Sequence, residues 1–328
     1  RSWWLNADGL SPTAGREVPS TLRSPQTTGL AGGEWCAYGL GTVAPEMPLD
    51  QRLDDAGSLV FDMPPLTEAL TIVGAPVVTL ELASDKPQAF VAVRLSDVAP
   101  DGAATRVSYG VLNLTHRDSH AEPTALEPGR RYRVEVAMTE AAHVFAPGQR
   151  LRISVSTCYW PMIWPSPEAA TLTISAGKSQ VDLPVLPSDR IRAHPDFPPA
   201  EHATPLARTT LAPGSETREV HYDVATDRTV VRNSRNDGCA RIDDTGTTVA
   251  YRKVKQFAIA RNDPLTAETE VSVSTHFRRA DWDARLETRI RMTADRTHFI
   301  FHADVDAFAD GQRCFSRSFD HRIARDQL

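Results

Sequence analysis

Two pairs of histidines have the spacing that suits a bound metal ion. His116 and His120 are four residues apart, as are His298 and His302. On a helix this spacing places both imidazoles on one face, where they can bind zinc. However, the first pair follows a strand-like stretch in a polar corner, and the second lies in an alternating, strand-like segment. We therefore expect surface or sheet-face histidines here, and we predict no metal and no other cofactor.

A serine nucleophile for acyl transfer would need a sharp strand-to-helix turn with the pattern G-x-S-x-G. No serine of this chain has glycine both two positions before it and two positions after it. The regular alternation of strands and helices that a doubly wound parallel sheet requires is also missing from the sequence pattern. We therefore predict no catalytic residue in this chain.

Neighbouring carboxylates can perform acid–base chemistry when they face each other across a cleft with separated pKa values. The candidate pairs are Asp54 with Asp55, Asp243 with Asp244, and Asp304 with Asp306. Adjacent acids on a strand point to opposite faces, and Asp304 and Asp306 share a face that is rich in charge. We expect these carboxylates to lie in turns or on solvated faces.

Two aromatic clusters are stronger candidates for a site. Residues 32–39 form a glycine-bracketed loop that carries Trp35, Cys36 and Tyr38. Glycines let the backbone approach a ligand, and exposed aromatic side chains are rare unless they meet a partner. Residues 158–167 carry the other cluster, whose aromatic members are Tyr159, Trp160 and Trp164, and their prolines prevent a regular strand. Both clusters could instead close the ends of a sandwich or pack on a neighbouring domain.

The elements that position these residues are predicted to be short strands. Val91, Val93 and Leu95 alternate with Ala92 and Arg94, which predicts a half-buried strand, and residues 78–82, 132–138 and 151–155 alternate in the same way. Turn sequences such as Pro100-Asp101-Gly102 separate these strands. This spacing predicts a β-sandwich or jelly roll over residues 1–187.

The composition and the alternating pattern of the sequence change after residue 187. Seven prolines fall within residues 184–213, and we assign residues 188–215 to a proline-rich linker. Alternation returns in residues 216–328 with longer strands. This pattern predicts an antiparallel β-sheet extension, a meander with one charged face and one buried face.

Composition excludes several classes of protein. The net charge is −6 for residues 1–187 and 0 for residues 188–328, so neither half has the positive charge that nucleic-acid binding needs. No apolar run approaches the length of a membrane span. The four cysteines have no metal-ligand spacing, and we expect buried free thiols and a cytoplasmic protein. The chain starts without an initiator Met or an apolar leader, so we expect it to begin inside a longer protein.

Several segments together resemble one family. The sequence resembles the C-terminal β-sandwich domain of the cocaine-esterase and X-prolyl dipeptidyl aminopeptidase group of α/β-hydrolase-type serine hydrolases. The resemblance rests on residues 93–120, 50–61, 72–76 and 143–153. It implies a galactose-binding-like jelly roll that packs on an upstream α/β-hydrolase domain holding the whole catalytic triad. It also implies that Trp35 and Cys36, with Tyr38 beside them, face the substrate pocket.

The sequence leaves three functions open. The first is a non-catalytic C-terminal region of a hydrolase of esters, amides or X-prolyl peptides, which helps to shape the substrate pocket. The second is a stand-alone carbohydrate-binding module, because jelly rolls bind sugars on exposed aromatic side chains. The third is a purely structural interface domain, with Tyr159, Trp160 and Trp164 as candidate interface aromatics and a homo-oligomer as one form of assembly. Fold alone does not separate these functions.

Overall fold

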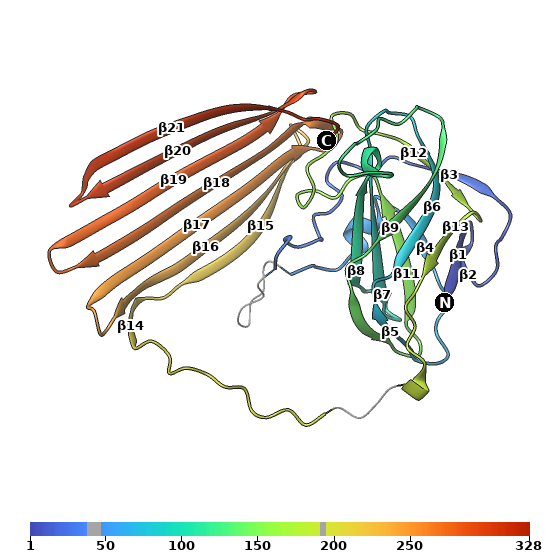
Figure 1. The fold of residues 1–328 in the computed structure, drawn as a ribbon, viewed down its shortest axis with the longest axis horizontal. Helices are drawn as coiled ribbons and strands as arrows, with labels where there is room; N and C mark the ends of the chain where they lie inside the picture. The colour runs from blue at the N-terminus through green and yellow to red at the C-terminus, as the bar shows by residue number, and fades with distance from the viewer. Residues whose placement is uncertain (38–46, 191–194) are drawn as a thin grey trace.

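The computed structural model describes residues 1–37, 47–190 and 195–328, and strands dominate these residues (Figure 1). Within these ranges the helical elements are α1 (Arg52–Asp55) and the short 3-10 helices η1 (Leu114–His116) and η2 (Ser188–Arg190). The predicted all-β class is confirmed. No helix in the described ranges is long and apolar enough to cross a membrane.

The first part of the chain is a β-sandwich. One layer has the strand order β2-β1-β13-β6-β12-β3, with β9 also paired to β6, and the other has the order β4-β11-β7-β8. A separate ribbon joins β5 to β10. The strands are β1 (Ser2–Asn6), β2 (Gly9–Ser11), β3 (Val18–Leu22), β4 (Leu59–Asp62), β5 (Leu70–Gly74), β6 (Val77–Ser84), β7 (Phe90–Val98), β8 (Ala104–Asn113), β9 (Arg131–Ala137), β10 (Ala141–Phe145), β11 (Arg150–Ser156), β12 (Leu172–Ala176) and β13 (Ser179–Asp182).

The core of the sandwich lies between its two layers. Leu80 and Leu82 of β6 pack in the same buried cluster as Val93 and Leu95 of β7. Successive side chains of a strand point to opposite faces, so the alternation seen in the sequence brings these residues to one side. The predicted sandwich is confirmed, together with the strand, turn and strand of β7 and β8.

Strand β7 differs from the prediction in one respect. The sequence predicted a half-buried strand, but every residue of β7 is buried. Its second face, which includes Phe90 and Ala92, packs against Tyr159 in the segment that follows β11. Arg94 lies on this second face and is fully buried. The half-buried prediction is wrong because a loop layer, and not solvent, covers the outer face.

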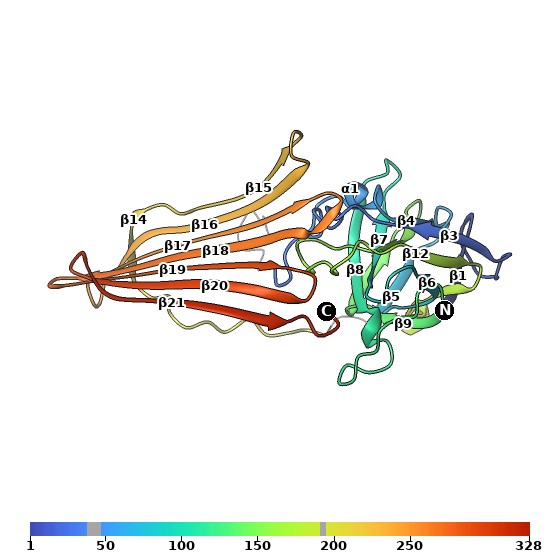
Figure 2. The same cartoon turned by 90° about the horizontal axis from the view of Figure 1, so that it is seen from above.

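The second part of the chain is one long antiparallel sheet that extends away from the sandwich (Figures 1 and 2). Its order is β14-β16-β17-β18-β19-β20-β21, with β15 also paired to β16, so the predicted meander is confirmed. Strand β14 lies inside the range assigned to the linker, and β21 forms one edge of the sheet. The strands are β14 (Arg208–Ala212), β15 (Ser215–Asp223), β16 (Arg228–Ile242), β17 (Thr247–Ala260), β18 (Asp263–Arg279), β19 (Trp282–Ala294), β20 (His298–Ala309) and β21 (Gln312–Ala324).

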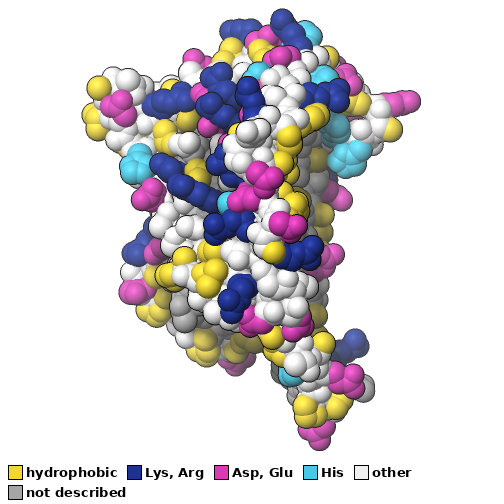
Figure 3. Space-filling model, turned by 90° about the vertical axis from the view of Figure 1, so that its left-hand side faces the viewer, with side chains coloured by type: hydrophobic (Ala, Val, Ile, Leu, Met, Phe, Trp, Pro, Cys, Tyr) yellow, Lys and Arg dark blue, Asp and Glu magenta, His cyan; other side chains and the backbone are white. Residues whose placement is uncertain are grey.

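The cross-strand register sorts the side chains of the long sheet onto two faces. Ile290 of β19 lies opposite Val271 of β18 and Ala303 of β20, so these residues share what we call the apolar face. Arg289 lies opposite Asp304 on the other side of the sheet, which we call the charged face. Seen toward the free ends of the long strands, basic and acidic side chains are interspersed over the surface (Figure 3).

The apolar face is buried only where it meets the sandwich. There, Val231 and Ile259 are fully buried, together with Ala267. Farther out, Leu286 is 44% exposed and Ile290 is 45% exposed. The expectation of one buried face is therefore wrong over the outer part of the sheet, because no second layer of the described residues covers it.

The cysteines also depart from expectation. All four are free, but only Cys158 is buried, whereas Cys36 and Cys314 are exposed and Cys239 is half-buried. Cys314 lies on the edge strand β21, and Cys36 lies in the glycine-bracketed loop. The prediction of buried thiols is wrong for Cys36 and Cys314 because the loop and the edge strand lack the second layer that covers Cys158. It is wrong for Cys239 because the long sheet is a single layer around this position of β16.

Candidate functional site

The loop of residues 29–37 begins in close contact with the second aromatic cluster. Gly29 has a φ of +114°, and a Cβ at this position would lie 2.5 Å from the carbonyl oxygen of Trp160. The amide of Trp160 donates to the carbonyl of Thr28 over 2.8 Å. Glycine is therefore required where the two aromatic clusters meet, and this contact fixes the start of the loop.

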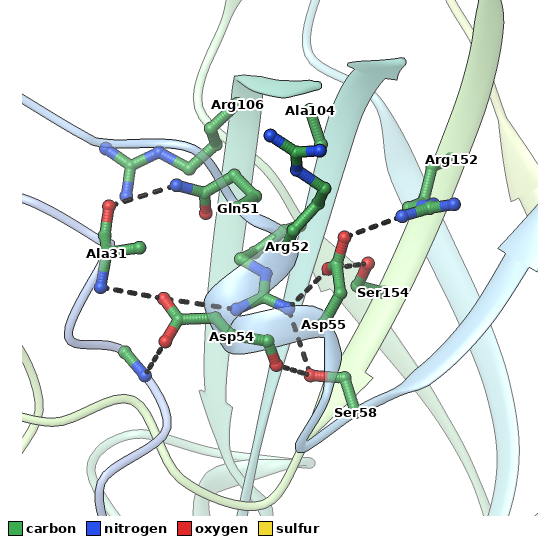
Figure 4. A network of polar contacts seen from close by, with 12 residues as sticks. Ala31, Gln51, Arg52, Asp54, Asp55, Ser58, Ala104, Arg106, Arg152 and Ser154 are labelled. Carbon is green, nitrogen blue, oxygen red and sulfur yellow. Dashed lines mark hydrogen bonds and ion pairs between the residues drawn. The ribbon is translucent and has the colours of Figure 1, made fainter. Parts of the chain in front are cut away.

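Asp54 holds the same part of the loop from the other side (Figure 4). Its carboxylate accepts hydrogen bonds from the amides of Gly29 (2.8 Å) and Ala31 (3.1 Å). Gln51 donates to the carbonyl of Ala31 over 3.0 Å. Burial raises the pKa of Asp54, while Arg94 at 3.6 Å and the two amides favour its charged form. The loop is thus held by backbone hydrogen bonds to buried side chains.

Asp55 extends this network into the sandwich (Figure 4). It accepts hydrogen bonds from Arg94 (2.9 Å), Arg152 (2.9 Å) and the hydroxyl of Ser154 (2.7 Å). Our expectation of a turn or solvated role for Asp54 and Asp55 is wrong. Both lie on α1, where Arg94 and Arg152 compensate their burial, and buried charges occur when they are paired in this way.

The buried members of the second cluster support the loop and do not line an open site. Arg106 donates to the carbonyl of Gly32 over 2.6 Å and to the hydroxyl of Tyr159 over 2.5 Å. Burial raises the pKa of the Tyr159 phenol and raises the pKa of the Cys158 thiol to about 12. At neutral pH, Cys158 is therefore a neutral packing residue and not a nucleophile.

Trp160 and Trp164 lie where the sandwich meets the long sheet. The ring of Trp160 packs edge-on against Phe257 with centroids 6.2 Å apart, and Trp164 makes the same kind of contact with Phe299. Arg325 donates to the carbonyl of Pro165 over 2.5 Å. In this chain Trp160 and Trp164 contact the long sheet, whereas Tyr159 packs against Phe90 and Ala92 of the sandwich. Contact of these three aromatics with a further domain stays a prediction.

The exposed part of the loop borders a hollow between the sandwich and the long sheet. Trp35 is 71% exposed and Cys36 is also exposed, whereas Tyr38 lies outside the described residues. The hollow has a volume of about 470 Å³. The residues that line it are Gly33, Glu34, Trp35, Cys36, Pro161, Met162, Arg218, Asn233, Arg235, Lys253, Lys255 and Phe257.

Glu34 ties the loop to the long sheet across this hollow. Its carboxylate pairs with the ammonium of Lys255 and accepts a hydrogen bond from Asn233. Arg218 donates to the carbonyl of Leu30 over 2.9 Å. Strands β15, β16 and β17 therefore supply one wall of the hollow and the loop supplies another. The basic side chains make the wall from the long sheet a candidate for binding anions.

The sequence carries signals for some of these residues, although none of them was predicted as part of a site. Arg94 interrupts an apolar run, which indicates either an edge position or a buried ion pair. Lys253 and Lys255 are two of only four lysines in the chain and are two residues apart, so a strand places both on one face. The partners of these cations are far away in the sequence, and spacing alone does not identify them.

The two histidine pairs that have the spacing of a metal site make different contacts in the structure. His116 and His120 lie against each other, with their Nδ1 atoms 3.4 Å apart. His302 contacts Asp320 and Asp304 on the charged face, and these two carboxylates raise its pKa. Within the described part of the chain, no group of three or more His, Cys, Asp or Glu side chains is arranged to hold a metal ion.

Comparisons with known proteins agree with the observed fold. The family model for the X-Pro dipeptidyl-peptidase C-terminal non-catalytic domain matches residues 1–206. The cocaine esterase of Rhodococcus sp. (strain MB1 Bresler) is 30% identical over 116 residues, which are 35% of this chain and 20% of the esterase. A putative serine esterase of Mycobacterium bovis is 27% identical over 124 residues, which are 33% of this chain and 20% of that protein.

A solved structure shows the same type of fold. An alpha-amino acid ester hydrolase aligns with a TM-score of 0.50 and 24% identity, over 56% of this chain and 36% of the hydrolase. The chain thus corresponds to about a fifth of the length of the esterases and about a third of that hydrolase. The match to the family model covers most of the chain and includes the whole sandwich. The chain therefore belongs to the family of X-Pro dipeptidyl-peptidase C-terminal non-catalytic domains.

Proposed function

We propose that this chain is the non-catalytic C-terminal region of a serine hydrolase, an acyl esterase or an X-prolyl dipeptidyl-peptidase. In this proposal the sandwich packs on an α/β-hydrolase domain of the same protein, and the loop of residues 29–37 forms part of the substrate pocket. Family membership supports the accessory role, since the family is named for a C-terminal, non-catalytic domain of a peptidase. The named esterases, of which the chain spans about a fifth, support a longer parent protein.

The single observation that carries the pocket role is the contrast between Trp35 and its support. Trp35 is 71% exposed, yet the loop that carries it is held by hydrogen bonds to Asp54, Gln51 and Arg106. A large aromatic surface on a rigid support can bind a ligand with little loss of conformational entropy. This arrangement is typical of a binding residue and is unusual for a side chain that only faces solvent.

The test is made on the full-length parent protein, which contains both this chain and the proposed α/β-hydrolase domain. We expect Trp35→Ala to lower kcat/KM for its best acyl substrate by about tenfold, which corresponds to the loss of one aromatic contact. The control is Trp282→Ala, which removes a half-exposed indole at the far end of the long sheet and should leave kcat/KM unchanged. If kcat/KM stays unchanged for ester, amide and X-prolyl substrates in the Trp35 variant, the pocket role is refuted.

Two further results would redirect the proposal. Binding of the chain to a glycan column, lost in Trp35→Ala, would assign the exposed indole to a carbohydrate-binding module. Unchanged kinetics of the Trp35 variant, together with loss of the parent's stability when this chain is deleted, would assign a purely structural role.

A further inference from the structure

The ion pairs on the charged face follow a simple rule. Arg289 pairs with Glu270 over 2.7 Å, and Arg291 pairs with Glu268 over 2.8 Å. Each of these pairs joins β19 to β18. Opposite charges on neighbouring strands stabilise a sheet, and like charges directly opposite each other destabilise it.

On the apolar face, one cross-strand pair places two like charges directly opposite each other. Arg235 of β16 lies directly opposite Lys253 of β17, and both side chains line the hollow beside Trp35. Asp237 at 2.6 Å and Glu216 at 3.4 Å neutralise Arg235 in part. The ammonium group of Lys253 has no hydrogen-bond or ion-pair partner among the described residues, although the side chain is half-buried. A positive charge is thus held next to another without its own counter-ion.

The surroundings strengthen the positive potential at this position. Among the described residues that line the hollow, four carry cationic side chains, and Glu34 is the only carboxylate. Glu34 is already engaged by Lys255 and Asn233. The half-buried guanidinium of Arg218 donates to the carbonyl of Leu30, and burial lowers its pKa although Glu34 and Asp54 favour its charged form. An anion bound between Arg235 and Lys253 would stabilise both of these charges.

The rest of the hollow is suited to an apolar group. Trp35, Met162 and Phe257 line it together with Pro161. A thioether and aromatic rings provide adaptable apolar contacts for a flat or aliphatic body. The volume of about 470 Å³ is within the range of small-molecule sites.

We infer that this hollow binds an organic carboxylate, with its anionic group between Arg235 and Lys253 and its apolar body against Trp35 and Met162. The inference deepens the proposed function and rests on it, because it assigns a substrate class to the pocket that Trp35 borders. The long sheet then selects substrates whose acyl or leaving group carries a negative charge.

Binding is tested on the full chain by calorimetry with phenylbutyrate, its neutral amide and inorganic phosphate. We expect the carboxylate to bind at least about tenfold more tightly than the amide, as for hydrogen bonds to charged groups. Lys253→Met keeps the apolar stem of the side chain and should remove this difference. The control Lys178→Met changes an exposed lysine in the hairpin between β12 and β13 and should preserve it.

Thermal unfolding of the same variants separates binding from folding. Because Lys253→Met removes a like-charge pair, its Tm without ligand should equal or exceed that of the unchanged chain. Phenylbutyrate should raise the Tm of the unchanged chain and not that of the variant. Equal binding of carboxylate and amide, or of phosphate and phenylbutyrate, would overturn the inference, as would normal carboxylate binding by a folded Lys253→Met variant.

The two proposals fail in different ways. If the carboxylate binds through Lys253 while Trp35→Ala leaves kcat/KM unchanged, the anion site stands and the pocket role fails. If Trp35→Ala lowers kcat/KM while Lys253→Met leaves carboxylate binding unchanged, the pocket role stands and the anion site fails.

Discussion

The sandwich and the long sheet are both antiparallel, yet they are stabilised in different ways. In the sandwich, β7 is buried on both faces, and a buried ionic network lies between its outer face and a loop layer. In the long sheet, most residues are half-buried or exposed on both faces, and the buried hydrophobic side chains lie near the sandwich. Apolar burial therefore dominates in the sandwich, whereas strand pairing, surface ion pairs and the contact with Trp160 and Trp164 stabilise the sheet. The sandwich carries the loop with Trp35, and the long sheet places cationic side chains beside this loop.

The largest effect on the free energy of unfolding is expected for the buried ionic network of the sandwich, which we compare with an exposed ion pair of the long sheet. Arg94→Leu leaves the buried carboxylates of Asp54 and Asp55 without their main cation and should lower the free energy of unfolding by about 3–5 kcal/mol. Arg289→Leu makes the same change at an exposed pair with Glu270 and should lower it by less than about 1 kcal/mol. Urea denaturation measures both values, and similar losses would show that the comparison is wrong.

The next effect tests apolar burial in the two units. Leu95→Ala removes a fully buried side chain of β7, and we expect a loss of about 2–5 kcal/mol in the free energy of unfolding. Leu286→Ala removes the same atoms from the half-exposed apolar face and should cost about 1 kcal/mol or less. Denaturant titration of each variant gives the difference. A large loss for Leu286→Ala would mean that its face is covered in solution.

The smallest effect concerns a turn of the long sheet. Asp295 accepts hydrogen bonds from the amides of Thr297 (2.7 Å) and His298 (2.8 Å), which lower its pKa to about 2. The folded pKa lies below the ordinary value near 3.8, so this stabilisation is present above pH 3.8 and is lost as pH falls toward 2. Asp295→Ala should lower Tm at pH 6, and the deficit should shrink as the pH falls.

The control for this experiment is Asp244→Ala, which changes an exposed aspartate between β16 and β17 and should show no such pH dependence. A deficit for Asp295→Ala that is constant from pH 6 to pH 2 would contradict the role of the ionised carboxylate.

Alternation was sufficient to predict strands β6, β7, β9 and β11 and the all-β character of both units of the fold. The side chains of β19 and β20 sort onto two faces as their sequence indicates, since the period of a strand is two residues. Alternation did not predict burial, because burial depends on what covers a face. Arg94 is buried because Tyr159 and α1 lie over it, and Leu286 is half-exposed because no described element lies over it.

The candidate site was only partly accessible from the sequence. The glycines around Trp35 indicated an aromatic loop, and the structure places Trp35 and Cys36 on the edge of a hollow. The opposite wall comes from Arg218, Arg235 and Lys253, about two hundred residues farther along the chain. Local patterns carry no information on such a distant juxtaposition, which arises from how the long sheet docks on the sandwich.

The position of β21 at the edge of the long sheet has a consequence for solubility. An edge strand offers unpaired amides and carbonyls to other chains, and charged side chains oppose such pairing. Strand β21 carries Arg313, Arg317 and Arg322. The neighbouring strand β20 has three phenylalanines and no lysine or arginine. The arginines of the outermost strand thus oppose intermolecular β-pairing at this edge of the sheet.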